Sequence, residues 1–172
     1  MNELSLLNKA FRKLTSGTDE RLVRRILDLN EKTSQKNLCL SESDAVELAE
    51  TRMSALIDNS RVEVGCGALE KLIVKFSESS FVERESWSAL LNELIQLFYF
   101  IKTETHDGIG DNELIETMYD IYESSGGSAE LLEGECERLI TRVNGSAPRE
   151  SSKNAKENGY HYDKAEDEAY DL

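Results

Sequence analysis

The chain contains a single proline, Pro148, so no residue before it can break a helix by lacking a backbone N–H. Throughout that long stretch, apolar residues recur at spacings of three and four, which is the period of an amphipathic helix. The segment 84–104 is hydrophobic almost all round, as is typical of a helix with neighbours on several sides. The sequence therefore predicts an all-α fold, a compact bundle of roughly five to seven helices around a central helix at about 84–104.

Local signals predict where several of these helices begin and end. The glycines at 126–127 should stop the helix that contains Leu114 and Met118, because glycine readily adopts the backbone angles that terminate a helix. The stretch "RVEVG", residues 61–65, alternates polar and apolar side chains and is expected to be extended. The expected N-caps are Thr18, Ser41 or Ser43, Asp111 and Ser128.

Charge divides the chain into three parts. The formal net charge is −14, and residues 38–144 carry eight Lys or Arg against twenty-two Asp or Glu. Residues 1–37 are mildly basic, with eight against five, and are expected to form a helical arm that packs on or leads into the core. Residues 145–172 have almost no aliphatic side chains and are expected to be a disordered acidic tail. The acidic helical domain is therefore placed at 38–144.

This charge also limits the function. An acidic surface repels phosphate backbones, so nucleic-acid binding is not expected, whereas a basic protein partner is. The start of the chain has no apolar run long enough for a signal peptide, and the longest run, "LIQLFYFI", is too short to cross a bilayer. The three cysteines are odd in number and lack the C-x-x-C spacing, so neither a disulfide framework nor a zinc site is predicted. A cytoplasmic protein without a transmembrane segment is expected.

The stretch "FYFIKTETHDGIGDNELIETM", residues 98–118, has the frame of an EF-hand calcium loop: aromatic residues, a short oxygen-rich loop and a second amphipathic segment. In that frame Lys102 takes the first ligand position, which calls for a carboxylate, and Asp107 takes the sixth, which calls for glycine. The loop is therefore interpreted as an ordinary helix–loop–helix, with a degenerate EF-hand-like site as the alternative. Its candidate ligands are Glu104, Asp107, Asp111 and Glu113.

Pairs of helix carboxylates suggest a second alternative. Helical nucleotide pyrophosphatases hold Mg²⁺ or Mn²⁺ with Glu-x-x-Glu followed by Glu-x-x-Asp, and a hydrolase of that type would need both pairs on one site. Within the expected folded part, the second spacing occurs at Glu104 and Asp107, but it does not follow closely on any pair of the first kind. We therefore interpret the pairs as solvated helix faces and predict no cofactor and no catalytic residue. The Glu-x-x-Glu pairs are Glu47/Glu50, Glu113/Glu116 and Glu130/Glu133.

Cys66, in "VGCGALE", is the candidate reactive thiol. It lies between glycines at an expected helix start, where the helix dipole lowers the pKa of a thiol. Glu63 and Glu70 are close in sequence and oppose a thiolate. The competing interpretation, a small buried thiol, is preferred.

From about Leu38 to Val143 the chain resembles an uncharacterised bacterial family, a domain of unknown function. The stretches that carry the resemblance are "LSESDAVELAETRMSALIDNSRVEVG", "LEKLIVKFSESSFVERESW" and "LFYFIKTETHDGIGDNELIETMYDIYE". The resemblance implies a compact helical domain, but the family brings no activity, cofactor or site residue to this chain.

Two places in the sequence suit contact with another protein. At the start of the chain Lys9, Arg12 and Lys13 lie opposite Leu4, Leu7 and Phe11, as in a basic amphipathic helix that docks on a partner or a membrane. The tail "GYHYDKAEDEAYDL" interleaves tyrosines with acids, which suits a docking peptide. The function predicted from the sequence is a non-catalytic protein-interaction domain, acting through its charged surface or its termini.

Overall fold

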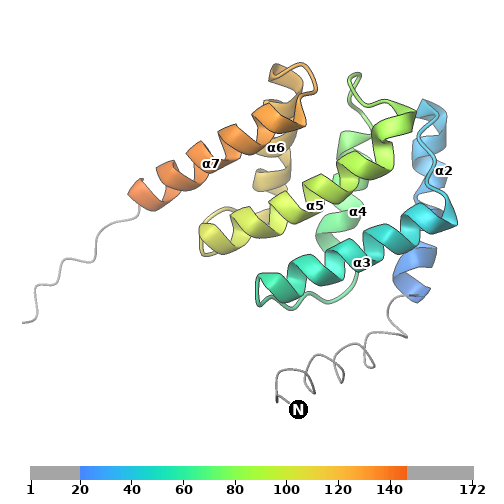
Figure 1. Cartoon of the computed structure of the whole chain (residues 1–172), viewed down its shortest axis with the longest axis horizontal. Helices are drawn as coiled ribbons and strands as arrows, with labels where there is room; N and C mark the ends of the chain where they lie inside the picture. The colour runs from blue at the N-terminus through green and yellow to red at the C-terminus, as the bar shows by residue number, and fades with distance from the viewer. Residues whose placement is uncertain (1–19, 147–172) are drawn as a thin grey trace, which may run out of the picture.

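A computed structural model describes residues 20–146, and this part of the chain is entirely helical, without a strand (Figure 1). The predicted all-α class is confirmed. Three expectations lie outside the described residues. They are the helix around Leu4–Leu14, the N-cap Thr18 of the helix expected after it, and nearly all of the disordered tail. The elements are a helical segment at 20–28, α2 (Asn30–Thr33), η1 (Ser34–Lys36), α3 (Glu42–Asp58), α4 (Gly67–Phe76), η2 (Arg84–Ser86), α5 (Trp87–Glu104), α6 (Asp111–Ser124) and α7 (Ala129–Ser146).

The central helix of the bundle is α5, as predicted from its all-round hydrophobicity. It packs against α3, α4 and α7, and Figure 1 shows α3, α5 and α7 side by side across one layer, with α4 and α6 behind them. The α-helix begins at Trp87 because Arg84–Ser86 forms a separate 3₁₀ turn. Trp87 and Phe98 of this helix are almost completely buried and belong to the core.

The back layer is held together by aromatic contacts between α4 and α6. The ring centroid of Phe76 lies 5.6 Å from that of Tyr119, in an edge-to-face arrangement, and 5.5 Å from the ring centroid of Tyr122. Such pairs stabilise the fold beyond the apolar area that they bury. The segment 20–28 also joins the core, since Leu22 and Ile26 are buried.

Several predicted helix ends are confirmed by their hydrogen bonds. Ser41, rather than Ser43, caps α3: its hydroxyl accepts from the Asp44 N–H at 3.2 Å, and the Asp44 carboxylate accepts from the Ser41 N–H at 2.8 Å. This reciprocal pair is a capping box. Gly126 and Gly127 have φ of 68° and 81° and end α6, and the Ser128 hydroxyl accepts from the Leu131 N–H at the start of α7.

One predicted cap is wrong. Gly110, and not Asp111, is the N-cap of α6, and Asp111 is the first residue of the helix itself. The reason is an ion pair that the sequence did not reveal: the Asp111 carboxylate lies 2.9 Å from the Lys102 ammonium. The Asp111 carboxylate is held at the buried ammonium by this charge-assisted contact, from its position in the first turn of α6.

Candidate functional site

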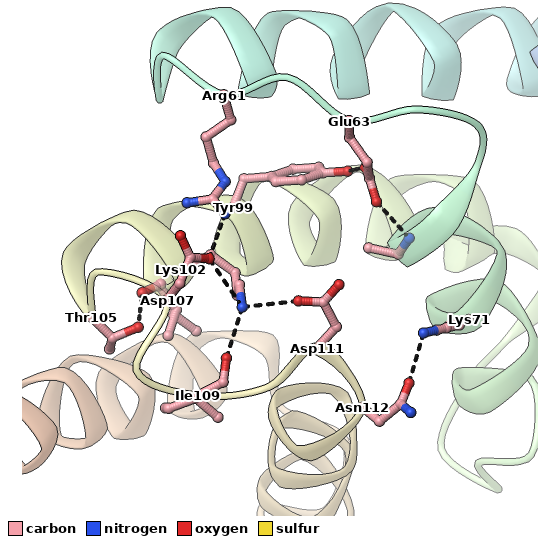
Figure 2. Close-up of polar contacts among 12 residues, drawn as sticks. Arg61, Glu63, Lys71, Tyr99, Lys102, Thr105, Asp107, Ile109, Asp111 and Asn112 are labelled. Carbon is pink, nitrogen blue, oxygen red and sulfur yellow. Dashed lines mark hydrogen bonds and ion pairs between the residues drawn. The ribbon is translucent and has the colours of Figure 1, made fainter.

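The loop between α5 and α6 is organised around the Lys102 ammonium. Lys102 is buried, and its Nζ donates to the Ile109 carbonyl oxygen at 2.7 Å while lying 3.1 Å from Asp107 Oδ1 and 2.9 Å from Asp111 Oδ1. Figure 2 shows these oxygens converging on the nitrogen. Burial lowers the pKa of Lys102, but the hydrogen bonds that it donates to Asp111 and Asp107 outweigh this effect and leave that pKa above its ordinary value. The side chain therefore places its own cation among the oxygens of the loop.

Of the four candidate metal ligands, the structure brings only two together. Asp107 and Asp111 both face Lys102, whereas Glu104 and Glu113 are exposed. The Asp107 carboxylate also accepts from Arg61, and this hydrogen bond holds the pKa of Asp107 below its ordinary value against the opposing effect of burial. Asp107 adopts the left-handed backbone, with φ of 58°, so the sharp turn forms there without glycine.

A second polar cluster lies under the 61–65 loop. The Glu63 carboxylate accepts from Arg52 at 3.0 Å, from the Ala68 N–H at 3.1 Å and from the Tyr99 hydroxyl (Figure 2 shows the Tyr99 contact). Burial, followed by the hydrogen bond to Glu63, raises the pKa of Tyr99. Arg52 is only 5% exposed and also donates to the Gly65 carbonyl oxygen, so this cluster connects α3, α5 and the start of α4.

Cys66 lies immediately before α4 and is buried. Burial raises the pKa of the Cys66 thiol, and this effect outweighs the nearby Arg25 and Arg52, which favour the thiolate. A protonated thiol is a poor nucleophile, so the position does not favour reactivity. The Glu63 carboxylate occupies the N-terminus of α4 instead, where it hydrogen-bonds Ala68.

The predicted Glu-x-x-Glu pairs lie on three different helices. Glu47/Glu50 is on α3 and Glu130/Glu133 is on α7, while Glu116 of the remaining pair, on α6, forms an ion pair with Lys75 at 2.6 Å. Within residues 20–146, no group of three or more His, Cys, Asp or Glu side chains is arranged to hold a metal ion. The α3 and α7 pairs do share a surface feature, because each lines a groove beside α5.

The larger of these grooves, about 580 Å³, runs between α5 and α7. Its floor is apolar and includes Leu94, Leu97 and Phe100 of α5, and Phe100 is 43% exposed although it belongs to the most hydrophobic helix. Its edges are carboxylates from both helices. They are Glu93, Glu130, Glu133 and Glu137.

Two further grooves continue this one across the same layer. The groove between α3 and α5, about 500 Å³, shares Gln96 and Phe100 with the first and adds Glu47, Glu50 and Asp58. We call these two the central grooves. A third, the outer groove of about 430 Å³, lies between the 20–28 segment and α3 and shares Glu50 with its neighbour. The three follow one another across α7, α5, α3 and the 20–28 segment.

The central grooves carry charge of one sign. Seven exposed carboxylates line them, and none of the described residues that line them is Lys or Arg. Elsewhere the described carboxylates are often paired, as Glu70 is with Arg25 and Glu116 is with Lys75. The seven are Glu47, Glu50, Asp58, Glu93, Glu130, Glu133 and Glu137.

Sequence reasoning missed most of this surface. The pattern of 84–104 predicts only that Leu97 and Phe100 belong to a central helix, and it gives Glu93 no role. A signal was present: Glu93, Gln96 and Phe100 are spaced by three and four residues, so they form one stripe along α5. The stripe of a central helix that is not covered by a neighbour is a candidate binding surface.

An all-helical domain with an acidic, apolar-floored surface is thus the class that fold and site define. The chain belongs to a family of unknown function, DUF6323, whose model matches residues 25–147. The match begins inside the 20–28 segment and so includes part of the stretch that the sequence assigned to the N-terminal arm. No curated protein and no solved structure matches the chain. Among the described helices, none is both long and apolar enough to span a membrane.

Proposed function

We propose that this protein is a non-catalytic interaction module whose central grooves bind a basic amphipathic helix of a partner protein. The observation that carries the proposal is the pairing of an apolar floor with carboxylate edges that lack any lining cation. Phe100 lies where the two central grooves meet and supplies an exposed aromatic anchor.

A helix that binds in these grooves uses both the apolar floor and the carboxylate edges. The apolar stripe of an amphipathic helix gains binding free energy by burying itself against Leu94, Leu97 and Phe100. Lys and Arg on its flanks then face the carboxylates, which speeds association and rejects acidic helices. A nucleic acid is negatively charged, unlike a basic helix, so this acidic surface does not suit nucleic-acid binding.

The cytoplasm is the proposed location. The three cysteines, Cys39, Cys66 and Cys136, are all free, which supports a reducing compartment. The assignment of the protein as non-catalytic is supported by the positions of its polar clusters: the carboxylates beside Lys102 and at Glu63 contact cations and hydrogen-bond donors of the fold itself.

The proposal is tested by measuring how the full chain binds two synthetic peptides, followed by fluorescence anisotropy. Both peptides are amphipathic with the same leucine stripe, and one carries Lys and Arg on its flanks while the other carries Glu. We expect the basic peptide to bind in the micromolar range, about −8 kcal/mol, and the acidic one not to bind. Raising the salt concentration should weaken binding of the basic peptide.

Two matched pairs of variants locate the binding site. Glu93→Lys with Glu137→Lys should weaken binding at least about tenfold, whereas Glu113→Lys with Asp120→Lys, an equal charge change on α6, should alter it less than about twofold. Phe100→Ala should also weaken binding, while Leu131→Ala, on α7 but outside the groove lining, should not. An equal loss with the α6 pair would contradict the proposal, because it would show that only the overall charge matters.

A further inference from the structure

We infer that the chain's own N-terminal segment, residues 1–19, docks along these grooves and competes with the partner helix. The inference rests on the proposed function, because it assigns a second occupant to the same surface. The helix of a partner protein must then displace the N-terminal segment before it can bind in the grooves.

The first observation is where the segment joins the described fold. Glu20, the residue that follows it, lines the outer groove together with Val23, Leu27, Val46 and Ala49. The outer groove adjoins the central grooves through Glu50. The segment therefore joins the described fold at the outer groove, which is next to the central grooves.

The second observation is the chemistry of the segment. Leu4, Leu7, Phe11 and Leu14 recur at helical spacing and form one apolar stripe, and the first fourteen residues contain a single acid, Glu3. Lys9, Arg12 and Lys13 lie opposite that stripe, and their long side chains can extend round the helix to carboxylates on the edges of the grooves. This is the basic amphipathic pattern that the central grooves fit.

Length also agrees. A fourteen-residue helix is about 21 Å long, which is shorter than α3, α5 and α7 with their 17 or 18 residues, so it can lie beside them without extending past their ends. Because the segment is covalently attached, its effective concentration at the grooves is on the order of millimolar. A contact that would be weak between separate molecules is therefore well populated within one chain, and it lowers the apparent affinity for any competing helix.

The test uses the full chain and, as its probe, a fluorescent synthetic peptide with the sequence of residues 1–16. Leu7→Ser with Phe11→Ser in the chain removes the docking stripe without changing the charge. We expect this variant to bind the probe at least about fivefold more tightly than the wild type, because its grooves are free. Asn8→Ala with Ser16→Ala, changes in the same segment outside the stripe, should bind it like the wild type.

The possible results separate the two proposals. If the Leu7→Ser, Phe11→Ser variant binds the probe no better than the wild type, the docked segment is excluded. If Glu93→Lys with Glu137→Lys still weakens binding in that variant, the proposed function stands; if it does not, the proposed function fails as well. Light scattering tests whether the docked segment belongs to the same chain or to a second copy. If the wild type is a dimer and Leu7→Ser with Phe11→Ser dissociates it, the segment docks between two copies, and the intramolecular contact is overturned.

Discussion

At the scale of single residues, the clearest feature is that Lys102 supplies a cation where an EF-hand would hold calcium. Its ammonium is surrounded by the Ile109 carbonyl and by the carboxylates of Asp107 and Asp111. From the sequence, the lysine counted only as a defect in the metal-binding pattern. In the structure it is the group that closes the loop, because a tethered positive charge satisfies oxygens that would otherwise repel one another.

Replacing Lys102 should therefore loosen this loop. Lys102→Met keeps most of the side-chain volume but leaves Asp111 without its cation and Asp107 with Arg61 alone, and we expect a loss of roughly 1–3 kcal/mol in the free energy of unfolding, measured with urea. Lys71→Met is the matched control, since Lys71 is exposed and donates only to Asn112 (Figure 2). It should cost less than about 0.5 kcal/mol.

Divalent ions provide the complementary measurement for the same loop. Ca²⁺, Mg²⁺ or Mn²⁺ should not raise the Tm of the wild-type chain, because the Lys102 ammonium faces the two carboxylates that a metal would need. A rise of several degrees would contradict this interpretation of the loop and revive the metal-binding alternative.

In the 61–65 loop a charged side chain is held inside the fold and apolar side chains face the solvent, which is the reverse of the usual pattern. Glu63 is held inside by Arg52, Tyr99 and Ala68, while Val62 and Val64 are 84% and 96% exposed. Glu63→Ala should cost about 3 kcal/mol in unfolding free energy, because it leaves the buried Arg52 without its carboxylate. Val64→Ala should be neutral within about 0.5 kcal/mol. Urea titration distinguishes the two, and equal effects would show that the Glu63 cluster is not structural.

At the scale of elements, the start of α3 gives a prediction that depends on pH. The Ser41 side-chain hydrogen bond, followed by its backbone hydrogen bond, holds the pKa of Asp44 below its ordinary value of 3.8. Because the folded-state pKa is depressed, this stabilisation is present above the unfolded value and is lost as the pH falls through the folded-state pKa. Ser41→Ala should therefore cost about 1 kcal/mol at neutral pH and less in acid.

The neighbouring serine gives the control for this capping box. Ser43 contacts the Ser41 hydroxyl at 2.9 Å but does not cap the helix, so Ser43→Ala should have a smaller effect at neutral pH. Urea titrations at neutral and acidic pH provide the comparison. A difference between Ser41→Ala and wild type that grew in acid would contradict the assigned role of Asp44.

At the scale of the whole molecule, the grooves concentrate negative charge at a cost to stability. Glu133 and Glu137 lie four residues apart on α7 and border the same groove, so their charges repel one another. Glu133→Gln with Glu137→Gln should raise the free energy of unfolding by up to about 0.5 kcal/mol at low salt, and should weaken binding of the basic peptide. Urea titration and anisotropy measure the two effects. A fall in stability would instead assign the two carboxylates a structural role.

The sequence by itself determined the features whose physical causes are local. The central helix followed from the hydrophobicity of 84–104, and several helix ends followed from Ser128, the glycines at 126–127 and the pair Ser41 or Ser43, of which the structure selects Ser41. Each depends on residues a few positions apart, and such short-range preferences hold where no tertiary contact competes with them, as one does at Asp111. The buried position of Cys66, preferred from its small apolar side chain, also agrees with the structure.

Only the tertiary structure decided which charged side chains meet. Arg61 and Asp107 are 46 residues apart, and Tyr99 and Glu63 are 36 residues apart, so no spacing in the sequence predicts their contacts. The same is true of the grooves, where carboxylates from α3, α5 and α7 border one surface while Phe100 is left exposed at its centre. Helical periodicity fixes which residues share a face of one helix, but the packing of helices decides which faces are covered and which charges become neighbours.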